Sequence, residues 1–332
     1  MAQLAYSAID QTTATKVATA KVIAYAWGFL GYNVGVVLWG AFVRASGSGA
    51  GCGKHWPLCN GEVIPQGPQL HTIIEFTHRI TSGFALLGVL LLWFLVRRST
   101  SRGHLARRAS IAAVVLMIVE ALLGASLVLL EYVGANQSAE RAAWLAMHFA
   151  NTLLLIGSLA LTAHWLRNPS YRGVAINRRN AFIAVIGLLA IITTGATGAI
   201  AALGDTLFRP ESLTGAIAQD FSASSHFLVR LRMLQPLIAV LSVLYLTWLV
   251  AKTASSRDAG VRRSAMLVFG LAFVQVLLGM TNIALLAPVW MQIVHLLFAE
   301  LLWIALVLLS ARLITPSQQA LQRVTEIPAA TA

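Results

Sequence analysis

The sequence predicts an all-α integral membrane protein in which eight transmembrane helices form two tandem four-helix bundles. Three observations lead to this fold class: the composition, the number of long apolar runs and an internal repeat. Of the 332 residues, 58% are hydrophobic and 11% are charged, and the mean hydropathy is +0.76. Soluble domains carry about 25% charged residues, so the lipid bilayer is the expected solvent of this chain.

Each expected span is an apolar run of about 20 residues, the length that crosses a bilayer as a helix. The first run is too long for a signal-peptide core and has no small-residue cleavage site, so we interpret it as a retained span. The expected spans lie near 22–43, 72–96, 109–131, 142–166, 181–203, 231–251, 264–286 and 290–313.

The net charge of +12 is concentrated in short stretches between the apolar runs. These stretches cover 97–108, 167–179 and 252–263, and an even number of spans places both termini on their side of the membrane. Basic loops lie in the cytoplasm, so this pattern explains the charge better than a nucleic-acid surface does. The seven of the 24 Lys and Arg residues expected outside are Arg44, Lys54, Arg79, Arg141, Arg209, Arg230 and Arg232.

The two halves of the chain repeat one another. Val-Glu-Ala-Leu-Leu-Gly at 119–124 corresponds to Val-Gln-Val-Leu-Leu-Gly at 274–279, and His148 in the following span corresponds to His295. Because each half has an even number of spans, we expect the copies to be related by a pseudo-two-fold axis along the membrane normal. The expected parts are a cytoplasmic tail (1–21), a first bundle (22–166), a cytoplasmic linker (167–180), a second bundle (181–313) and a cytoplasmic tail (314–332).

Three histidines, His78, His148 and His295, fall inside apolar runs near their outer ends. A polar side chain at this depth is costly and indicates function, although a single histidine can also join helices as a hydrogen-bonding group. Zinc favours a cluster with cysteine or carboxylate ligands, whereas haem iron needs one or two axial imidazoles. We therefore predict one haem site at His78 and His148 in the first bundle and a second anchored by His295.

Residues Glu75 to Arg79 form the segment beside the first predicted iron ligand. Glu75 lies three residues before His78 and so shares its helical face; a carboxylate there suits proton transfer or stabilisation of a developing cation. Arg79 is placed to hold a haem propionate. The alternative is that Glu75 and Arg79 form an ion pair at the rim, and the pair could serve both purposes.

The two cysteines of the chain, Cys52 and Cys59, lie in the first outer loop. The outer compartment of bacteria is oxidising, so we expect them to form a disulfide. Its role is either to close the loop over the haem site or to act as a redox relay.

The chain resembles the haem A synthase family in four features. They are Gly40–Arg44 leading into Ser46–Gly49, the loop Cys52–Pro65 with Trp-Pro-Leu-Cys-Asn-Gly at 56–61, the segment Glu75–Arg79, and the histidines His148 and His295. The resemblance implies an enzyme of the bacterial cell membrane that oxidises the methyl group of haem O to a formyl group, giving haem A for cytochrome oxidase.

The resemblance also implies the roles of individual residues and the partners. The first half would bind substrate haem through His78 and His148, with Glu75 in catalysis and a Cys52–Cys59 disulfide, and the second half would hold a haem b cofactor. The haem O synthase that farnesylates haem would be the upstream partner, with membrane lipid as the surroundings; the sequence identifies no electron donor.

The sixth span departs from the family pattern, which has a histidine on the second, fourth, sixth and eighth helices. Gln235 stands at the expected depth, while His226 lies 26 residues before Lys252, about 39 Å along a helix and outside the hydrocarbon. Three explanations remain open: haem b is bound by His295 alone, His226 folds inward, or this half binds haem weakly or not at all. Arg232, with Arg230, is placed for propionates in each case.

A non-catalytic dihaem electron carrier of the cytochrome b type is the main alternative function. It explains histidines within helices equally well. It does not explain a carboxylate three residues from an axial ligand in one copy only, nor the specific outer loop. A transporter with structural histidines is weaker still, because no span shows a clear break by Gly or Pro.

Overall fold

The computed structural model describes residues 18–167 and 177–314, and their regular structure is helical apart from one isolated bridge between Cys59 and Glu62. Within these residues eight helices are long and apolar enough to cross a membrane, as predicted. Most of the two predicted tails and of the linker lies outside the described residues. The eight spans are α2 (Ala20–Ala45), α3 (Leu70–Ser99), α4 (Leu105–Leu129), α5 (Ala139–Leu166), α6 (Arg178–Leu207), α8 with α9 (Phe227–Arg232 and Leu234–Ala254), α10 (Ala259–Ala284) and α11 (Val289–Ile314).

The third outer segment contains helices that the sequence analysis did not predict. Helix α7 (Leu213–Phe221) lies within it, capped by the Ser212 side chain, and α8 starts the sixth span earlier than expected. The span is interrupted at Met233. Pro236 explains the interruption, because it has no N–H to donate and its ring would clash with the carbonyl of Arg232 one turn earlier.

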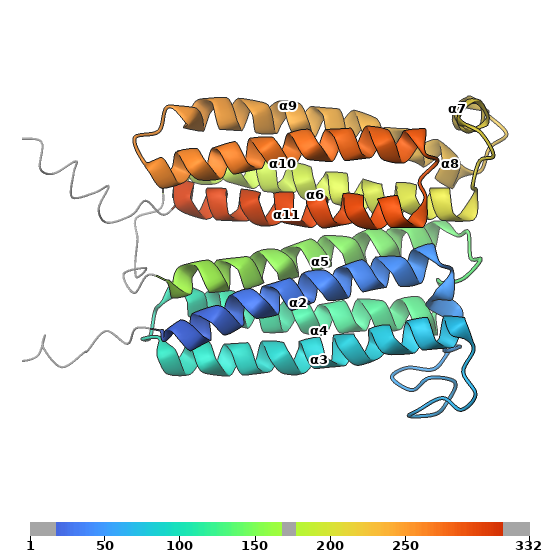
Figure 1. Ribbon diagram of the computed structural model, residues 1–332, viewed down its shortest axis with the longest axis horizontal. Coiled ribbons are helices and arrows are strands. Elements are labelled where there is room, and N and C mark those ends of the chain that lie inside the picture. The colour runs from blue at the N-terminus through green and yellow to red at the C-terminus, as the bar shows by residue number, and fades with distance from the viewer. Residues whose placement is uncertain (1–17, 168–176, 315–332) are drawn as a thin grey trace, which may run out of the picture.

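The spans form two groups of four that lie side by side (Figure 1). Helices α2, α3, α4 and α5 surround one core, which we call the first bundle, and α6, α9, α10 and α11 surround the other, the second bundle. Neighbours in each ring are in contact, so α3 stands opposite α5, and α9 stands opposite α11. The pseudo-two-fold axis between the bundles stays a prediction.

The outward faces of the spans are covered by large apolar side chains. Phe84 and Leu87 on α3, and Leu244 and Phe273 in the second bundle, are each about 60% exposed or slightly more. Apolar surface of this extent needs a nonpolar surrounding. Their backbone polar groups are satisfied within the helices, as a bilayer requires. The chain is therefore a multi-pass membrane protein.

The bundles meet where α5 packs against α6 and α11, with a further contact between α2 and α11. The Trp303 indole N–H of α11 donates to the carbonyl of Leu153 on α5 at 2.6 Å. A Cβ at Gly157 would lie 3.3 Å from the same indole nitrogen, so a small residue allows this close approach.

Arg44 at the outer end of α2 reaches across to the second bundle. Its guanidinium donates to the Ala202 carbonyl at 2.7 Å, to Thr206 Oγ1 at 2.9 Å and to Gln292 Oε1 at 3.0 Å. One side chain of the first bundle thus bonds to both α6 and α11.

Candidate functional site

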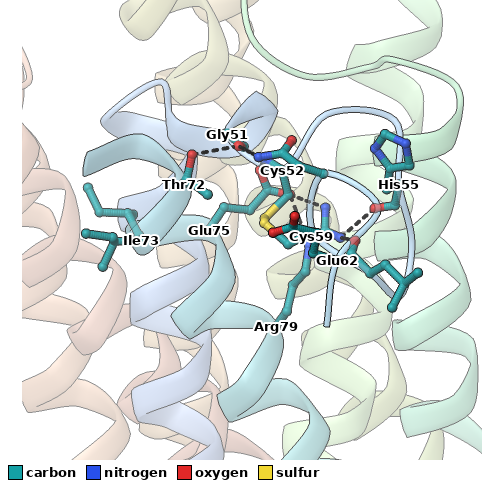
Figure 2. The surroundings of a disulfide bond; sticks show 12 residues. Gly51, Cys52, His55, Cys59, Glu62, Thr72, Ile73, Glu75 and Arg79 are labelled. Atoms are coloured by element: carbon teal, nitrogen blue, oxygen red, sulfur yellow. Dashed lines mark hydrogen bonds and ion pairs between the residues drawn. A yellow bond between two sulfur atoms is a disulfide. The ribbon is translucent and has the colours of Figure 1, made fainter. Parts of the chain in front are cut away.

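The cysteine loop lies over the outer end of α3 and is closed by a Cys52–Cys59 disulfide, which confirms the prediction (Figure 2). A Cβ at Gly51 would lie 2.4 Å from the His71 carbonyl oxygen, so only glycine lets the loop lie against the first turn of α3. The Thr72 hydroxyl donates to the Gly51 carbonyl at 2.9 Å and fixes this contact.

Glu75 is buried beneath this loop, with 4% of its surface exposed. The Cys52 backbone N–H donates to its Oε2 at 2.8 Å. Arg79 Nε donates to Oε1 at 3.1 Å, and a second guanidinium nitrogen of Arg79 bonds to the same oxygen. Both carboxylate oxygens are therefore held, one by the disulfide loop and one by the arginine of the next turn (Figure 2).

Arg79 also bonds directly to the loop. It donates to the carbonyl oxygens of His55 at 2.5 Å and Leu58 at 2.6 Å. The alternative interpretation of Glu75 and Arg79 as an ion pair is thus what the structure shows. Binding of a propionate by Arg79 stays a prediction, and it would require Arg79 to exchange some of these contacts.

His78 and His148 lie on α3 and α5, the opposite helices of the first bundle. They are close enough to interact electrostatically. His78 packs over Gly40 of α2, where a Cβ would be 2.9 Å from its Cε1, and His148 packs over Gly124 of α4, where the corresponding distance is 3.8 Å. The structure therefore brings together the two residues predicted to ligate one iron.

Glu120 on α4 supports His148 and was not identified as a site residue from the sequence. Its Oε1 lies 3.3 Å from His148 Nδ1. Asn151 Nδ2 donates to Oε2 at 2.6 Å, and the Thr152 hydroxyl bonds to Oε1. The available signal was a carboxylate inside a span, which by itself indicates function.

Glu300 on α11 is the second carboxylate that the sequence analysis missed. It is fully buried, and among the described residues neither of its oxygens has a hydrogen-bond partner. Glu120 lies near enough to act on it electrostatically. A carboxyl group thus lies in the apolar interior, on the helix that carries His295.

The corresponding positions of the second bundle carry neutral side chains, and the contact with the histidine is at the other ring nitrogen. His295 packs over Gly279, with a Cβ-to-Cε1 distance of 3.3 Å, and its Nε2 lies 3.1 Å from Gln275 Nε2. Gln235 packs over Gly198, where a Cβ would be 3.2 Å from its Nε2. The Thr197 hydroxyl donates to Gln235 Oε1 at 2.6 Å.

Arg232 and His226 are both engaged at the outer end of this bundle. Arg232 bonds to Asp220 at 2.5 Å and to Asp205 at 3.2 Å. His226 Nδ1 accepts from the Leu228 N–H at 3.3 Å and so caps α8. A propionate contact of Arg232 stays a prediction. His226 lies at the N-terminal end of α8, before the long helix α9, and its position outside the membrane also stays a prediction.

The residues present fit a porphyrin iron. His78 and His295 each have a buried Nδ1 without a hydrogen bond among the described residues, while Nδ1 of His148 faces Glu120, and each of the three rings lies against a glycine. Within the same part of the chain, no group of three or more His, Cys, Asp or Glu converges as a metal-ion cluster does. One or two imidazoles per bundle match axial ligation of haem.

A model of the COX15-CtaA family of cytochrome oxidase assembly proteins matches residues 24–307. The chain belongs to this family. Similar proteins include the heme A synthases of Alkalihalophilus pseudofirmus, 41% identical over 128 residues, and Bacillus mycoides, 39% identical over 126 residues. Each alignment covers 38% of this chain, with 40% and 38% of the respective relative. These matches confirm the predicted membership of the haem A synthase family.

A second group of relatives carries a different name. Two proteins from separate strains of Thermus thermophilus are named protoheme IX farnesyltransferase and are 46% identical to this chain over 304 residues. The alignment covers 88% of this chain and 48% of each relative. The chain thus spans about half the length, or less, of the curated relatives that it matches.

Proposed function

We propose that this protein is a haem A synthase that oxidises the methyl group of haem O to a formyl group. The observation that supports this most directly is the arrangement in the first bundle, where the buried carboxylate of Glu75 lies one turn from His78 and His148 lies on the opposite helix. Family membership across residues 24–307 supports the same reaction class.

In this proposal haem O is the substrate, and His78 and His148 hold its iron from two sides. The methyl carbon would be hydroxylated twice, and the hydrate would then lose water to leave the aldehyde. Overall R–CH3 + H2O gives R–CHO + 4 H⁺ + 4 e⁻, and the four electrons would pass to an external oxidant. Glu75 is placed to stabilise the positive charge that develops at that carbon or to accept its proton. The second bundle would hold haem b through His295. When bound, haem b would supply one-electron redox chemistry.

The cysteine loop positions Glu75 in this proposal. The Cys52 N–H and the Arg79 guanidinium bond to its two oxygens, so the carboxylate cannot rotate freely. A fixed charge next to the reacting atom needs no reorganisation during the reaction, which is how preorganised groups accelerate chemistry.

The farnesyltransferase relatives support a link to the preceding reaction. Their name describes farnesyl transfer to protoheme IX, and this chain matches only 48% of each. We infer that the rest of those proteins performs the transfer, and that a haem O synthase delivers the substrate here. Location in a bacterial cell membrane with both termini in the cytoplasm belongs to the same proposal.

The test is mass analysis of haems extracted from the purified protein and from the Glu75→Gln variant. We expect the wild type to yield haem O and haem A, and the variant to keep haem O while haem A falls by about 100-fold or more, the usual cost of removing a preorganised catalytic group. Glu62→Gln is the matched control, because Glu62 is an exposed carboxylate of the same loop that bonds to the Gln66 N–H.

Two outcomes would contradict the proposal. If the Glu75→Gln variant forms haem A at the normal rate, Glu75 does not have the catalytic role proposed for it. Extracts of the wild type that contain haem b alone favour the dihaem electron carrier instead.

A further inference from the structure

We propose that Gln235 takes the place of the second axial histidine in the second bundle, so that a haem bound there has His295 as its one protein ligand. The coordination position on the Gln235 side would then accept a small external ligand such as carbon monoxide. This inference rests on the proposed function, in which the second bundle holds haem b.

Gln235 occupies in the second bundle the position that His78 occupies in the first. Each residue lies on the second long helix of its bundle and packs over a glycine of the first, Gly40 under His78 and Gly198 under Gln235, at 2.9 Å and 3.2 Å from the position of a Cβ. The residue opposite in each bundle is a histidine over a glycine of the third long helix. The same four positions are thus occupied, with one imidazole replaced by an amide.

The amide of Gln235 already forms a hydrogen bond within the protein. Its oxygen accepts a hydrogen bond of 2.6 Å from Thr197. Haem iron in proteins is bound by histidine, cysteine, methionine or tyrosine. A neutral amide held by a hydroxyl group is a poor competitor for iron, so it lies beside the coordination position without filling it.

Two other side chains near Gln235 that could bind iron, His226 and Met233, are not placed to do so. His226 caps α8 through Nδ1 at 3.3 Å, and its ring packs against Phe208 and Phe227 with centroid distances of 4.8 Å and 4.5 Å. Met233 is two residues from Gln235, and residues at this spacing do not share a helical face. Neither side chain is placed to approach His295 across the bundle.

The experiment uses the full-length protein with its bound haems. Haem b is quantified chemically, its spin state is measured by electron paramagnetic resonance, and carbon monoxide binding is measured on the reduced protein. We expect a high-spin ferric signal, and carbon monoxide bound in an amount equal to the haem b content. Gln235→His should convert this signal to low spin and reduce carbon monoxide binding at least tenfold.

Two further variants make the test independent of the folding of Gln235→His. Gln235→Leu should keep carbon monoxide binding, because the amide is not a ligand, and His226→Ala should leave both signals unchanged. A wild-type haem b that is entirely low-spin, or a change of spin state in His226→Ala, would overturn the inference alone. Absence of haem b would overturn the cofactor proposal together with the inference, and the chemical assay detects that case separately.

Discussion

The two bundles place similar helices around their predicted haem sites but differ in the charge of the supporting side chains. In the first bundle the carboxylate of Glu120 lies 3.3 Å from His148. In the second, the amide of Gln275 lies 3.1 Å from His295. Glu75 lies three residues before His78, and the residue at the same spacing before Gln235 is the basic Arg232.

This difference shows where the chain keeps costly groups. A carboxylate within a bilayer is expensive and is retained where it has a function, whereas an amide forms similar hydrogen bonds without a full charge. The first bundle keeps Glu75 and Glu120 close to its histidines. The second has the amides Gln275 and Gln235, and its one buried carboxylate described above, Glu300 on α11, is on the helix that packs against α5 of the first bundle. We infer that the first bundle performs the reaction and the second binds a haem without transforming it.

Replacing the side chain that supports each histidine should have the largest effect on haem binding and on the reduction potential of the haem. A carboxylate behind a ligating histidine raises its basicity and fixes its ring, and losing such a partner costs about 10–100-fold in affinity or activity. We expect Glu120→Gln to lower haem retention in the first bundle by this factor and to raise the reduction potential of that haem. The measurements are haem content after purification and a redox titration.

The reciprocal variant, Gln275→Glu, is the matched control. It should lower the potential of the haem held by His295 and leave the first bundle unchanged. If both variants have wild-type potentials, the side chains at positions 120 and 275 do not distinguish the bundles.

Removing the disulfide tests the loop that only the first bundle has. The bond closes a loop of sequence separation 7, so its loss in Cys52→Ser/Cys59→Ser should destabilise the protein by about 2–3 kcal/mol. Thermal unfolding in detergent measures this effect. Haem A formation should fall in parallel, because the Cys52 N–H holds Glu75. A loss of haem A formation with unchanged stability would indicate a redox relay instead.

Alanine at the glycines that contact these side chains should have the smallest effect, and the effect should again differ between the two bundles. A Cβ at Gly40 meets the rigid ring of His78 at 2.9 Å, so Gly40→Ala should cost about 1–3 kcal/mol through overpacking and release haem. Gly198→Ala meets the end of a flexible amide at 3.2 Å and should cost less. Gly35→Ala, with nothing within 4 Å, is the control and should be neutral or stabilising. Equal haem loss in all three would contradict the assigned contacts.

Much of the fold could be predicted from the sequence because the bilayer imposes a simple rule on it. Apolar runs of sufficient length become spans, and all eight predicted spans correspond to helices that could cross a membrane. The disulfide was predictable for a similar reason, since Cys52 and Cys59 are the only cysteines. The position of His78 opposite His148 was predictable from their similar depth on the second and fourth spans, which run in the same direction through the bundle.

The remaining features depend on contacts that sequence spacing does not encode. Helix α7 is short and lies in a segment between two predicted spans that contains Gly204, Pro210 and several serines, residues typical of loops. Arg232 was expected to face a propionate, yet Asp205 and Asp220 approach it from other parts of the chain. Glu120 belongs to the repeated segment, but its role could not be predicted, because only the packing of α4 against α5 shows that it reaches His148.

The arginine at the end of α2 has a consequence for how this protein could be divided. The guanidinium of Arg44 has its hydrogen bonds with Ala202, Thr206 and Gln292, all of which belong to the other half of the chain. A polypeptide that stopped after the fourth span would leave this cation without those acceptors. Co-expressed fragments should therefore need one another to persist in the membrane.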